Sequence, residues 1–253
     1  MTRTLLAALA LLGATLTLTA AEKEPRVFEL RVYTIHEGKL DAFTGVVRDT
    51  ATKLYAKHGM AAQGFFVPTQ NKDSMFYSLL AHANMAARTA TWAALRADPD
   101  GVAMLDKLKA DKVVAKAQEI FLTETDYTTK VEVAPGKAER VFELRTYTTT
   151  PGNLAALDAR FRDHTRALFT KHGMTNLWYY HLTPESKAAD VTMIYFLAHA
   201  SEAARGKSFD HFRNDPDWVA ARDASEKKAG GSLTTKDGVQ SVVLKATEFS
   251  PLR

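Results

Sequence analysis

The 253-residue sequence contains no cysteine. Disulfide bonds, catalytic thiols, thiolate metal sites and lipid anchoring through an N-terminal cysteine are therefore excluded. The sequence also lacks a Gly-x-Ser-x-Gly elbow, a phosphate-binding glycine loop and a dinucleotide fingerprint, so hydrolases, kinases and dehydrogenases have no support. No short-range spacing of the His-Glu-x-x-His kind is present, and we expect no metal site. Stability has to come from packed apolar cores.

Neither sign of charge dominates the sequence. It has 33 Lys and Arg against 29 Asp and Glu, a formal net charge of +4. Basic and acidic residues are interspersed, whereas a nucleic-acid binder concentrates basic residues on one face. We therefore expect no nucleic-acid partner.

The first residues follow the three-part order of a secretory signal. Arg3 precedes an apolar stretch over residues 5–18, and Thr19-Ala-Ala21 stands before a charged run. An uncleaved anchor would need about 20 predominantly apolar residues, and threonines and a glycine dilute this stretch. We predict a signal peptide over residues 1–21, export to the periplasm or cell exterior, and no stable membrane span after its removal. The mature charge is then 32 minus 29, or +3.

One segment of the sequence occurs twice. Val27-Phe-Glu-Leu-Arg-Val-Tyr-Thr34 returns as Val141-Phe-Glu-Leu-Arg-Thr-Tyr-Thr148, and the Lys-His-Gly-Met run at 57–60 returns at 171–174 with the same offset, 141 minus 27 or 114. This period is too long for a solenoid repeat and suits two small domains. We divide the mature chain into a first copy (22–130), a linker (131–140) and a second copy (141–253).

Each copy has the order strand, helix, strand, strand, helical pair, strand. In the second copy the patterns predict strands over 141–148, 177–181, 191–199 and 239–245, and helices over 152–171, 201–213 and 216–228. The first copy follows suit, with strands over 65–67, 75–82 and near Ile120 and a helix start at Asp98-Pro. This βαββαβ order is ferredoxin-like, an antiparallel sheet with helices on one face.

The uncovered face of such a sheet needs a partner, and the other copy is the simplest one. We predict an α+β fold in which two tandem ferredoxin-like domains pack sheet to sheet as a pseudo-dimeric α/β barrel. On the first strand, apolar Phe28, Leu30 and Val32 alternate with polar residues. We place the apolar side under the helices. The polar residues would then converge in the barrel interior, namely Glu29, Arg31, Tyr33 and their counterparts Glu143, Arg145 and Tyr147.

Several strings of the second copy resemble the NIPSNAP family when taken in order. They are Glu143-Leu-Arg-x-Tyr147, Arg160-Phe-Arg-Asp-His-Thr165, Lys171-His-Gly-Met174, Asp215-Pro-Asp-Trp218 and Thr247-Glu-Phe-Ser-Pro-Leu252. The resemblance covers the second copy and, more loosely, the first. It implies a dimeric α/β-barrel fold but little chemistry, because the family's molecular activity is poorly defined and its eukaryotic members are linked to vesicles, mitochondria and protein partners. The first copy departs at Thr50 and Gly101, where the second has His164 and Trp218.

Candidate ligand-binding residues gather in the second copy, namely Arg145, Tyr147, His164, Trp178, Tyr179 and His199. Arg145 could bind an anion or pair with Glu143. His164 lies at helical spacing on or next to the buried stripe, as a core histidine or an acid–base or ligand residue. Trp178 and Tyr179 belong to an aromatic run that alternates between faces, which serves core packing or forms a wall for a flat ligand. His199 ends a strand where a barrel mouth would open.

His58 and His172 each stand immediately before a glycine. A cationic side chain complements the C-terminus of a helix, and the glycine supplies the left-handed cap. We therefore expect both histidines to close helices and not to act in catalysis.

Two functions remain open. The first is an exported, non-catalytic module that binds a small molecule or a protein, with no cofactor. The second is a small α/β-barrel enzyme, such as a cofactor-independent monooxygenase, or a haem-handling protein, which is an analogy by fold alone. Because Thr50 and Gly64 stand where the second copy has His164 and Trp178, we expect any pocket mainly in the second copy. Homo-oligomerisation is also open.

Overall fold

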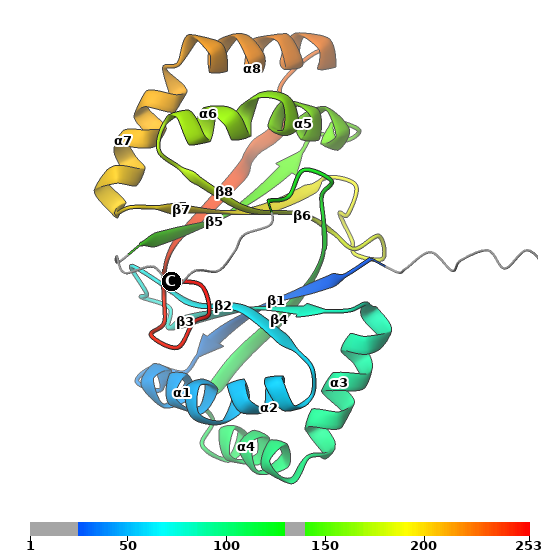
Figure 1. The fold of residues 1–253 in the computed structure, drawn as a ribbon, viewed down its shortest axis with the longest axis vertical. Coiled ribbons are helices and arrows are strands. Elements are labelled where there is room, and N and C mark those ends of the chain that lie inside the picture. Colours follow the sequence, from blue (N-terminus) through cyan, green and yellow to red (C-terminus); the bar gives the residue numbers. More distant parts are fainter. Residues whose placement is uncertain (1–24, 130–139) are drawn as a thin grey trace, which may run out of the picture.

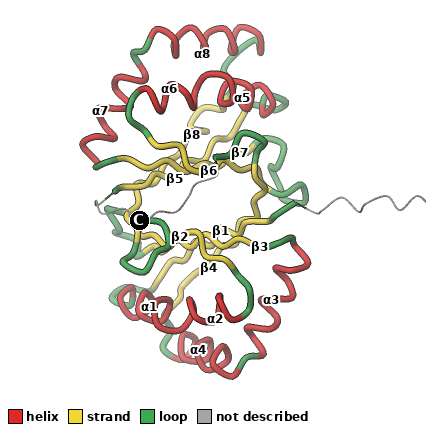
Figure 2. Tube along the Cα trace, viewed as in Figure 1, coloured by secondary structure: helices red, strands yellow, loops and turns green. Residues whose placement is uncertain are grey.

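The computed structural model describes residues 25–129 and 140–253, so the predicted signal peptide and the predicted linker up to residue 139 lie outside the described residues. Eight strands form one closed barrel in the order β1-β3-β2-β8-β5-β7-β6-β4. The helices of each copy cover the outer side of its own sheet, and the two sheets face each other at the centre (Figures 1 and 2).

The elements follow the predicted order in both copies. The first copy has β1 (Val27–Ile35), α1 (Leu40–Val46), η1 (Val47–Ala51), α2 (Thr52–Lys57), β2 (Ala61–Pro68), β3 (Met75–His82), α3 (Met85–Ala97), α4 (Pro99–Ala110) and β4 (Val114–Glu124). The second has β5 (Val141–Thr149), α5 (Leu154–Arg160), η2 (Phe161–Thr165), α6 (Arg166–Lys171), β6 (Thr175–Leu182), β7 (Thr192–His199), α7 (Glu202–Arg213), α8 (Pro216–Ala229) and β8 (Thr234–Ala246).

The strand pairing is that of two ferredoxin-like sheets joined at two seams. Strand β1 pairs antiparallel with β3 and β4, and β5 pairs in the same way with β7 and β8. At one seam Phe66 of β2 lies opposite Ala246 of β8, and at the other Leu122 of β4 lies opposite Leu182 of β6. The predicted pseudo-dimeric α/β barrel is confirmed.

The helix starts that the sequence signals are formed as local hydrogen bonds. The side chain of Ser201 accepts from the amide of Ala204, and that of Asp215 accepts from the amide of Asp217. These side-chain caps satisfy amides that the first helical turn leaves free. Proline follows Asp215 at the first helical position. Its lack of a backbone N–H does no harm there, because an N–H at this position would have no acceptor within the helix.

The long helix of each copy contains a π-helical turn that the apolar spacing did not predict. In the second copy the amide of Arg166 donates to the carbonyl of Phe161. The hydroxyl of Thr165 donates to the carbonyl of Arg160 at 3.1 Å. One inserted residue breaks the 3.6-residue period, so positions inside the turn lie on different faces from those of a regular helix.

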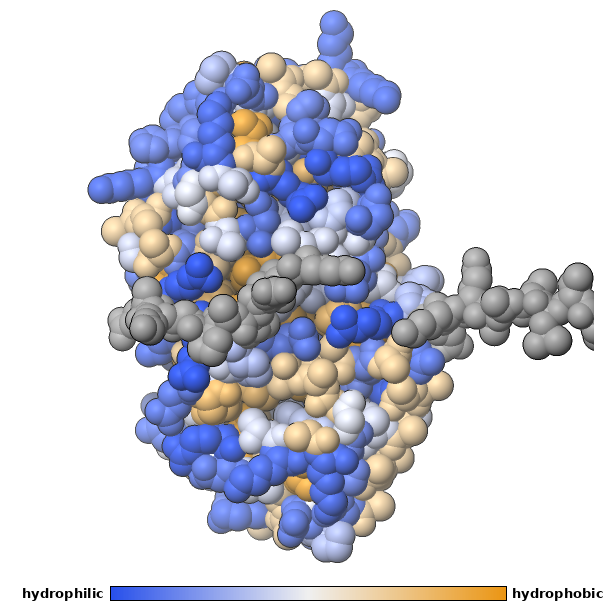
Figure 3. All heavy atoms as spheres, in the orientation of Figure 1, coloured by the Kyte–Doolittle hydropathy of each residue, from blue (hydrophilic) through white to orange (hydrophobic). Residues whose placement is uncertain are grey.

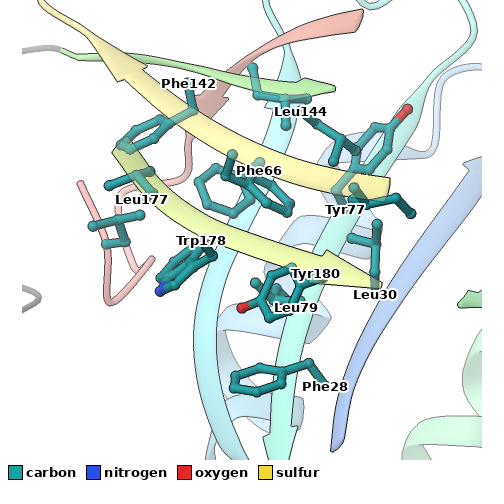
Figure 4. Close-up of a cluster of buried hydrophobic side chains, with 14 of the residues drawn as sticks. Phe28, Leu30, Phe66, Tyr77, Leu79, Phe142, Leu144, Leu177, Trp178 and Tyr180 are labelled. Atoms are coloured by element: carbon teal, nitrogen blue, oxygen red, sulfur yellow. The ribbon is translucent and has the colours of Figure 1, made fainter. Parts of the chain in front are cut away.

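The barrel interior is apolar, and our prediction of a polar interior was wrong. Phe28 and Leu30 lie between the sheets in one cluster with side chains of the second copy, and the ring of Phe28 packs 4.9 Å from that of Tyr180 (Figure 4). The polar side of β1 faces the helices instead. The reason is the supply of donors, because the inward faces of the two sheets carry an apolar cluster, whereas helix α3 brings the side-chain donors of Arg88 and Trp92 to Glu29.

Each copy ends in a tail that completes the core of the other. After β4, Tyr127 packs against Tyr179 with ring centroids 5.5 Å apart. After β8, Phe249 packs against Phe65 at 5.4 Å, and Leu252 is buried in the barrel interior. The two copies therefore depend on each other at both seams and both tails.

Hydrophilic side chains cover much of the two helical layers, with hydrophobic ones interspersed (Figure 3). None of the helices in the described part of the chain is long and apolar enough to span a membrane.

Candidate ligand-binding site

A buried glutamate on the first strand of each copy lies at the centre of a polar cluster under the helices. In the first copy, Glu29 has no exposed surface. Arg31 donates to its Oε1 at 2.6 Å, and Arg88 donates to Oε1 at 2.9 Å and to Oε2 at 3.0 Å. The indole of Trp92 donates to Oε2 at 2.8 Å, and His82 Nε2 lies 3.3 Å from the same atom. Burial alone would raise the pKa of Glu29, but the neighbouring His82, the bonds from Arg88 and the charge of Arg31 hold that pKa well below its usual range.

The second copy repeats this cluster around Glu143. Arg145 donates to Oε1 of Glu143 at 2.6 Å, and Arg205 binds both oxygens at 2.7 and 2.8 Å. His199 Nε2 lies 3.1 Å from Oε2. Burial would raise the pKa of Glu143, but bonds from His199 and Arg205 hold it well below its usual range. Arg145 and His199 thus serve as partners of a buried carboxylate, and His199 is buried here and not at a barrel mouth.

The two clusters differ in charge. In the first, Glu119 on β4 lies 2.8 Å from Arg31 and 2.7 Å from Arg88, so two carboxylates balance two guanidinium groups. In the second, the residue opposite Arg145 on β8 is Ser241, so one carboxylate faces two guanidinium groups. The second cluster depends more heavily on its glutamate.

The structure does not bring the six predicted site residues together. Trp178 lies in the barrel interior, where its ring packs 5.7 Å from that of Phe196 (Figure 4). Tyr179 lies on the other side of the sheet with Arg145 and Tyr147, and Arg145 donates to the Tyr147 hydroxyl at 3.2 Å. This placement confirms that the aromatic run alternates between the two faces.

His164 is exposed, which corrects its predicted position next to the buried stripe. The prediction counted three residues from Phe161 and four to Leu168 along a regular helix. The π-helical turn over residues 161–165 interrupts that count. His164 lines two surface grooves between its own helix and α8, together with Asp163.

His58 and His172 close helices, as predicted. Each is the C-cap residue of its helix, and the glycine that follows has a φ of 78°. Each also bonds the residue that caps the last helix of its copy, since His58 Nε2 lies 2.9 Å from Asp98 and His172 Nε2 lies 2.6 Å from Asp215. The histidines therefore tie two helices together.

A cavity of about 460 Å³ lies between the sheet and the helices of the first copy. Aromatic, aliphatic and basic side chains line it, namely Arg31, Tyr33, His36, Phe43, Val46, Val47, Ala51, Tyr55, Trp92, Met104, Leu105, Leu108, Lys109, Lys112, Val114 and Ala117. The π-helical turn contributes Val47 and Ala51. The sequence prediction missed this cavity. The signal that could have revealed it is the small size of Val47, which stands where the second copy has Phe161.

The inner part of the cavity is aromatic and carries no net charge. The guanidinium of Arg31 lies 4.4 Å from the ring centre of Trp92 and donates to the Tyr33 hydroxyl at 2.6 Å. Its charge is balanced by Glu29 and Glu119. Burial raises the pKa of both Tyr33 and Tyr55, so both phenols are neutral at pH 7 and can hydrogen-bond a ligand.

Larger side chains occupy the equivalent positions of the second copy. Phe161 is buried, and its ring packs 5.7 Å from Tyr147 and 5.2 Å from Tyr195. Arg160, which stands where the first copy has Val46, is buried with its guanidinium 5.2 Å from the ring centre of Trp218. The space under the helices is thus filled in the second copy and open in the first.

The first turn of α4 also has a smaller residue than the equivalent turn of α8 in the second copy. Gly101 takes the place of Trp218, and a Cβ on Gly101 would lie 2.0 Å from the carbonyl oxygen of Leu95. Helix α4 therefore approaches the end of α3 more closely than a side chain at this position would allow. Within residues 25–129 and 140–253, no group of three or more His, Asp or Glu residues is placed to hold a metal ion.

Two βαββαβ units closed into one barrel, with a cavity between one sheet and its helices, define an α/β-barrel protein of the ferredoxin-like type. The sequence model of the NIPSNAP family matches residues 28–129 and 142–251. The chain belongs to the NIPSNAP family, which confirms the resemblance seen in its motifs.

Two solved structures with TM-scores above 0.5 show the same fold at low sequence identity. A proposed monooxygenase from Lactobacillus acidophilus NCFM is 14% identical, with a TM-score of 0.56 over 88% of this chain and 94% of the other. One from Fusobacterium nucleatum is 10% identical, with a TM-score of 0.57 over 88% and 93%. A NIPSNAP family protein from Agrobacterium tumefaciens is 20% identical over 44% of this chain and 95% of its own, with a TM-score of 0.39. No curated protein matches the chain.

Proposed function

We propose that the protein is an exported binding protein for a small aromatic molecule, which it holds in the cavity of the first copy. The cavity itself carries this proposal. Its volume of about 460 Å³ lies within the range of about 300–1,000 Å³ that is usual for ligand pockets. Its walls are mainly apolar and aromatic, and the neutral phenols of Tyr33 and Tyr55 supply the few polar groups that orient a ligand.

The alternative is a small enzyme, such as a cofactor-independent monooxygenase, or a haem-handling protein, that would use the same cavity. The fold neighbours described as proposed monooxygenases share the fold alone. Binding is favoured because none of the residues that line the cavity is a carboxylate, and the one lining histidine, His36, is exposed. The guanidinium of Arg31 stays protonated and cannot accept a proton, so a general base inside the cavity would have to be a neutral phenol.

Replacing Val47 with phenylalanine should abolish ligand binding with little change in stability. The variant copies the filled arrangement of the second copy, where Phe161 occupies this position. Binding is measured by thermal shift with 1-naphthol, 2-naphthoate and haem, since a ligand at 100 times its Kd stabilises a protein by about 2.7 kcal/mol.

The matched control is Thr50→His, which gives the first copy the exposed histidine of the second copy without filling the cavity. It should bind as the wild type does. Undiminished binding by the Val47→Phe variant would place the ligand elsewhere.

Export belongs to the same proposal and is supported by the order of residues in the first 21 positions. The protein isolated from its native cells should begin near Ala21 or Glu22 and be found outside the cytoplasm. N-terminal sequencing after cell fractionation measures this. A cytoplasmic form that retains Met1 or Thr2 would contradict it.

A further inference from the structure

We infer that the ligand of this cavity is an aromatic carboxylate, whose rings lie among the inner aromatic side chains and whose carboxylate lies at the mouth beside Lys109 and Lys112. This inference rests on the proposed function and names its ligand class. It comes from the distribution of charge around the cavity.

The charges of the lining residues are all of one sign. Arg31, Lys109 and Lys112 line the cavity, and neither aspartate nor glutamate does. Arg31 is balanced by Glu29 and Glu119 in the layer behind it. The uncompensated positive charge of the cavity is therefore at its mouth, where the two lysines are.

The two lysines at the mouth form no ion pair within the described part of the chain. The nearest acidic residue in sequence, Asp111, is bound by Lys107 at 2.8 Å. Its carbonyl accepts from Lys39. Lys109 and Lys112 are exposed and have no carboxylate within 4.0 Å among the residues described. Their ammonium groups are thus available to an anion.

Lys112 adds an independent observation, because it occupies a backbone position that favours glycine. The amide of Val113 donates to the carbonyl of Leu108 and that of Lys112 to the carbonyl of Lys109, which is the helix-ending pattern with a left-handed residue. The φ of Lys112 is 47°. In the second copy the same pattern places Gly230 there, with a φ of 75°.

A positive charge near the end of a helix is favourable wherever it stands, and this accounts for Lys109. This effect does not explain why a lysine occupies the left-handed position itself, because the Cβ of any side chain strains the backbone there. The copy with the open cavity has that lysine, and the copy with the filled space has glycine. We attribute the lysine to recognition of an anion at the mouth.

The aromatic side chains of the inner walls favour a flat ring system as the part of the ligand that lies inside the cavity. The aromatic side chains of Phe43, Tyr55 and Trp92 line the cavity, and the flat ring of a ligand can pack against them stacked or edge to face. The Tyr33 hydroxyl accepts from Arg31 and retains its own proton, which it can donate to a ligand oxygen.

The test compares an acid with its uncharged isostere on the full mature protein. Titration calorimetry gives the Kd of 2-naphthoate and of 2-naphthamide for the wild type, for the Lys109→Gln/Lys112→Gln variant and for a control. The control is Lys72→Gln/Lys116→Gln, which removes the same charge from residues outside the cavity lining.

The wild type should bind the acid about 10-fold more tightly than the amide, and the preference should weaken as salt is added. The Lys109→Gln/Lys112→Gln variant should lose this preference while its affinity for the amide stays the same, and the control should keep it. Equal binding of acid and amide by the wild type would overturn the carboxylate inference and leave the cavity as a binding site. Binding of neither compound would instead contradict the proposed function.

Discussion

Replacing Glu143 with glutamine should lower the free energy of unfolding by about 3–5 kcal/mol, the usual cost of removing one partner from a buried ion pair. The carboxylate of Glu143 has no exposed surface and accepts from Arg145 and Arg205. Glutamine keeps the shape and loses the charge, so two guanidinium groups would face a neutral amide. Urea denaturation at pH 7 gives the change.

Glu29→Gln is the matched control in the other copy, and it should cost less. Without Glu29, the cations Arg31 and Arg88 keep Glu119 as a partner. The second copy offers Ser241 at the equivalent place. A larger loss for Glu29→Gln than for Glu143→Gln would show that Glu119 does not support the first cluster.

The effect of Glu143→Gln should also depend on pH. The pKa of Glu143 is lower in the folded protein than in the unfolded chain. The stability that this carboxylate contributes is therefore fully present above the unfolded pKa of about 4.3 and is lost as the pH falls towards the folded pKa. The difference between wild type and variant should narrow below about pH 4.3. A difference that is constant from pH 7 to pH 3 would contradict the charged state of Glu143.

The sequence predicted the helices and strands well, but it did not predict which side of each strand faces the helices. The reason is physical. Alternation along β1 separates Glu29 and Arg31 from Phe28 and Leu30, but it does not say which side meets helices. The side of β1 that meets the helices is decided by hydrogen-bond donors on α3, which is distant in sequence. A buried carboxylate is stable only where such donors surround it.

The candidate site was harder to predict because it depends on which side chains are missing. The sequence prediction placed the pocket in the second copy because His164 and Trp178 have no equivalents in the first. The structure places one at the surface and the other in the barrel core. The cavity exists because Val47 is small where Phe161 is large, and the π-helical turn that directs both inward leaves no trace in the apolar spacing.

The duplication separates two demands that a single unit would have to meet together. A space under the helices that is open to a ligand lowers the stability of the fold, because the side chains around it lose packing contacts. In this chain the second copy fills that space with Phe161 and Arg160. The first copy keeps it open while both halves share one barrel core.

That shared core leads to the second large effect, which we expect from Phe66→Ala. Phe66 is fully buried at the seam between β2 and β8, and its ring packs 5.2 Å from Phe142 and 6.1 Å from Phe196 of the other copy (Figure 4). Truncation of a buried phenylalanine costs about 3–5 kcal/mol. The exposed Val102→Ala, at 42% exposure, should change stability by no more than about 0.5 kcal/mol.

The way in which the Phe66→Ala variant unfolds is as informative as the size of the loss. Because the missing ring contacts both copies, the two should lose stability together and unfold in one transition. Tryptophan fluorescence separates the copies, since Trp92 reports on the helices of the first and Trp218 on those of the second. In single-tryptophan variants that retain one or the other, Phe66→Ala should lower the free energy of unfolding by the same amount. If the second copy kept its wild-type midpoint while the first unfolded early, the barrel interior would not be a common core, and the two copies would be independent domains that merely touch.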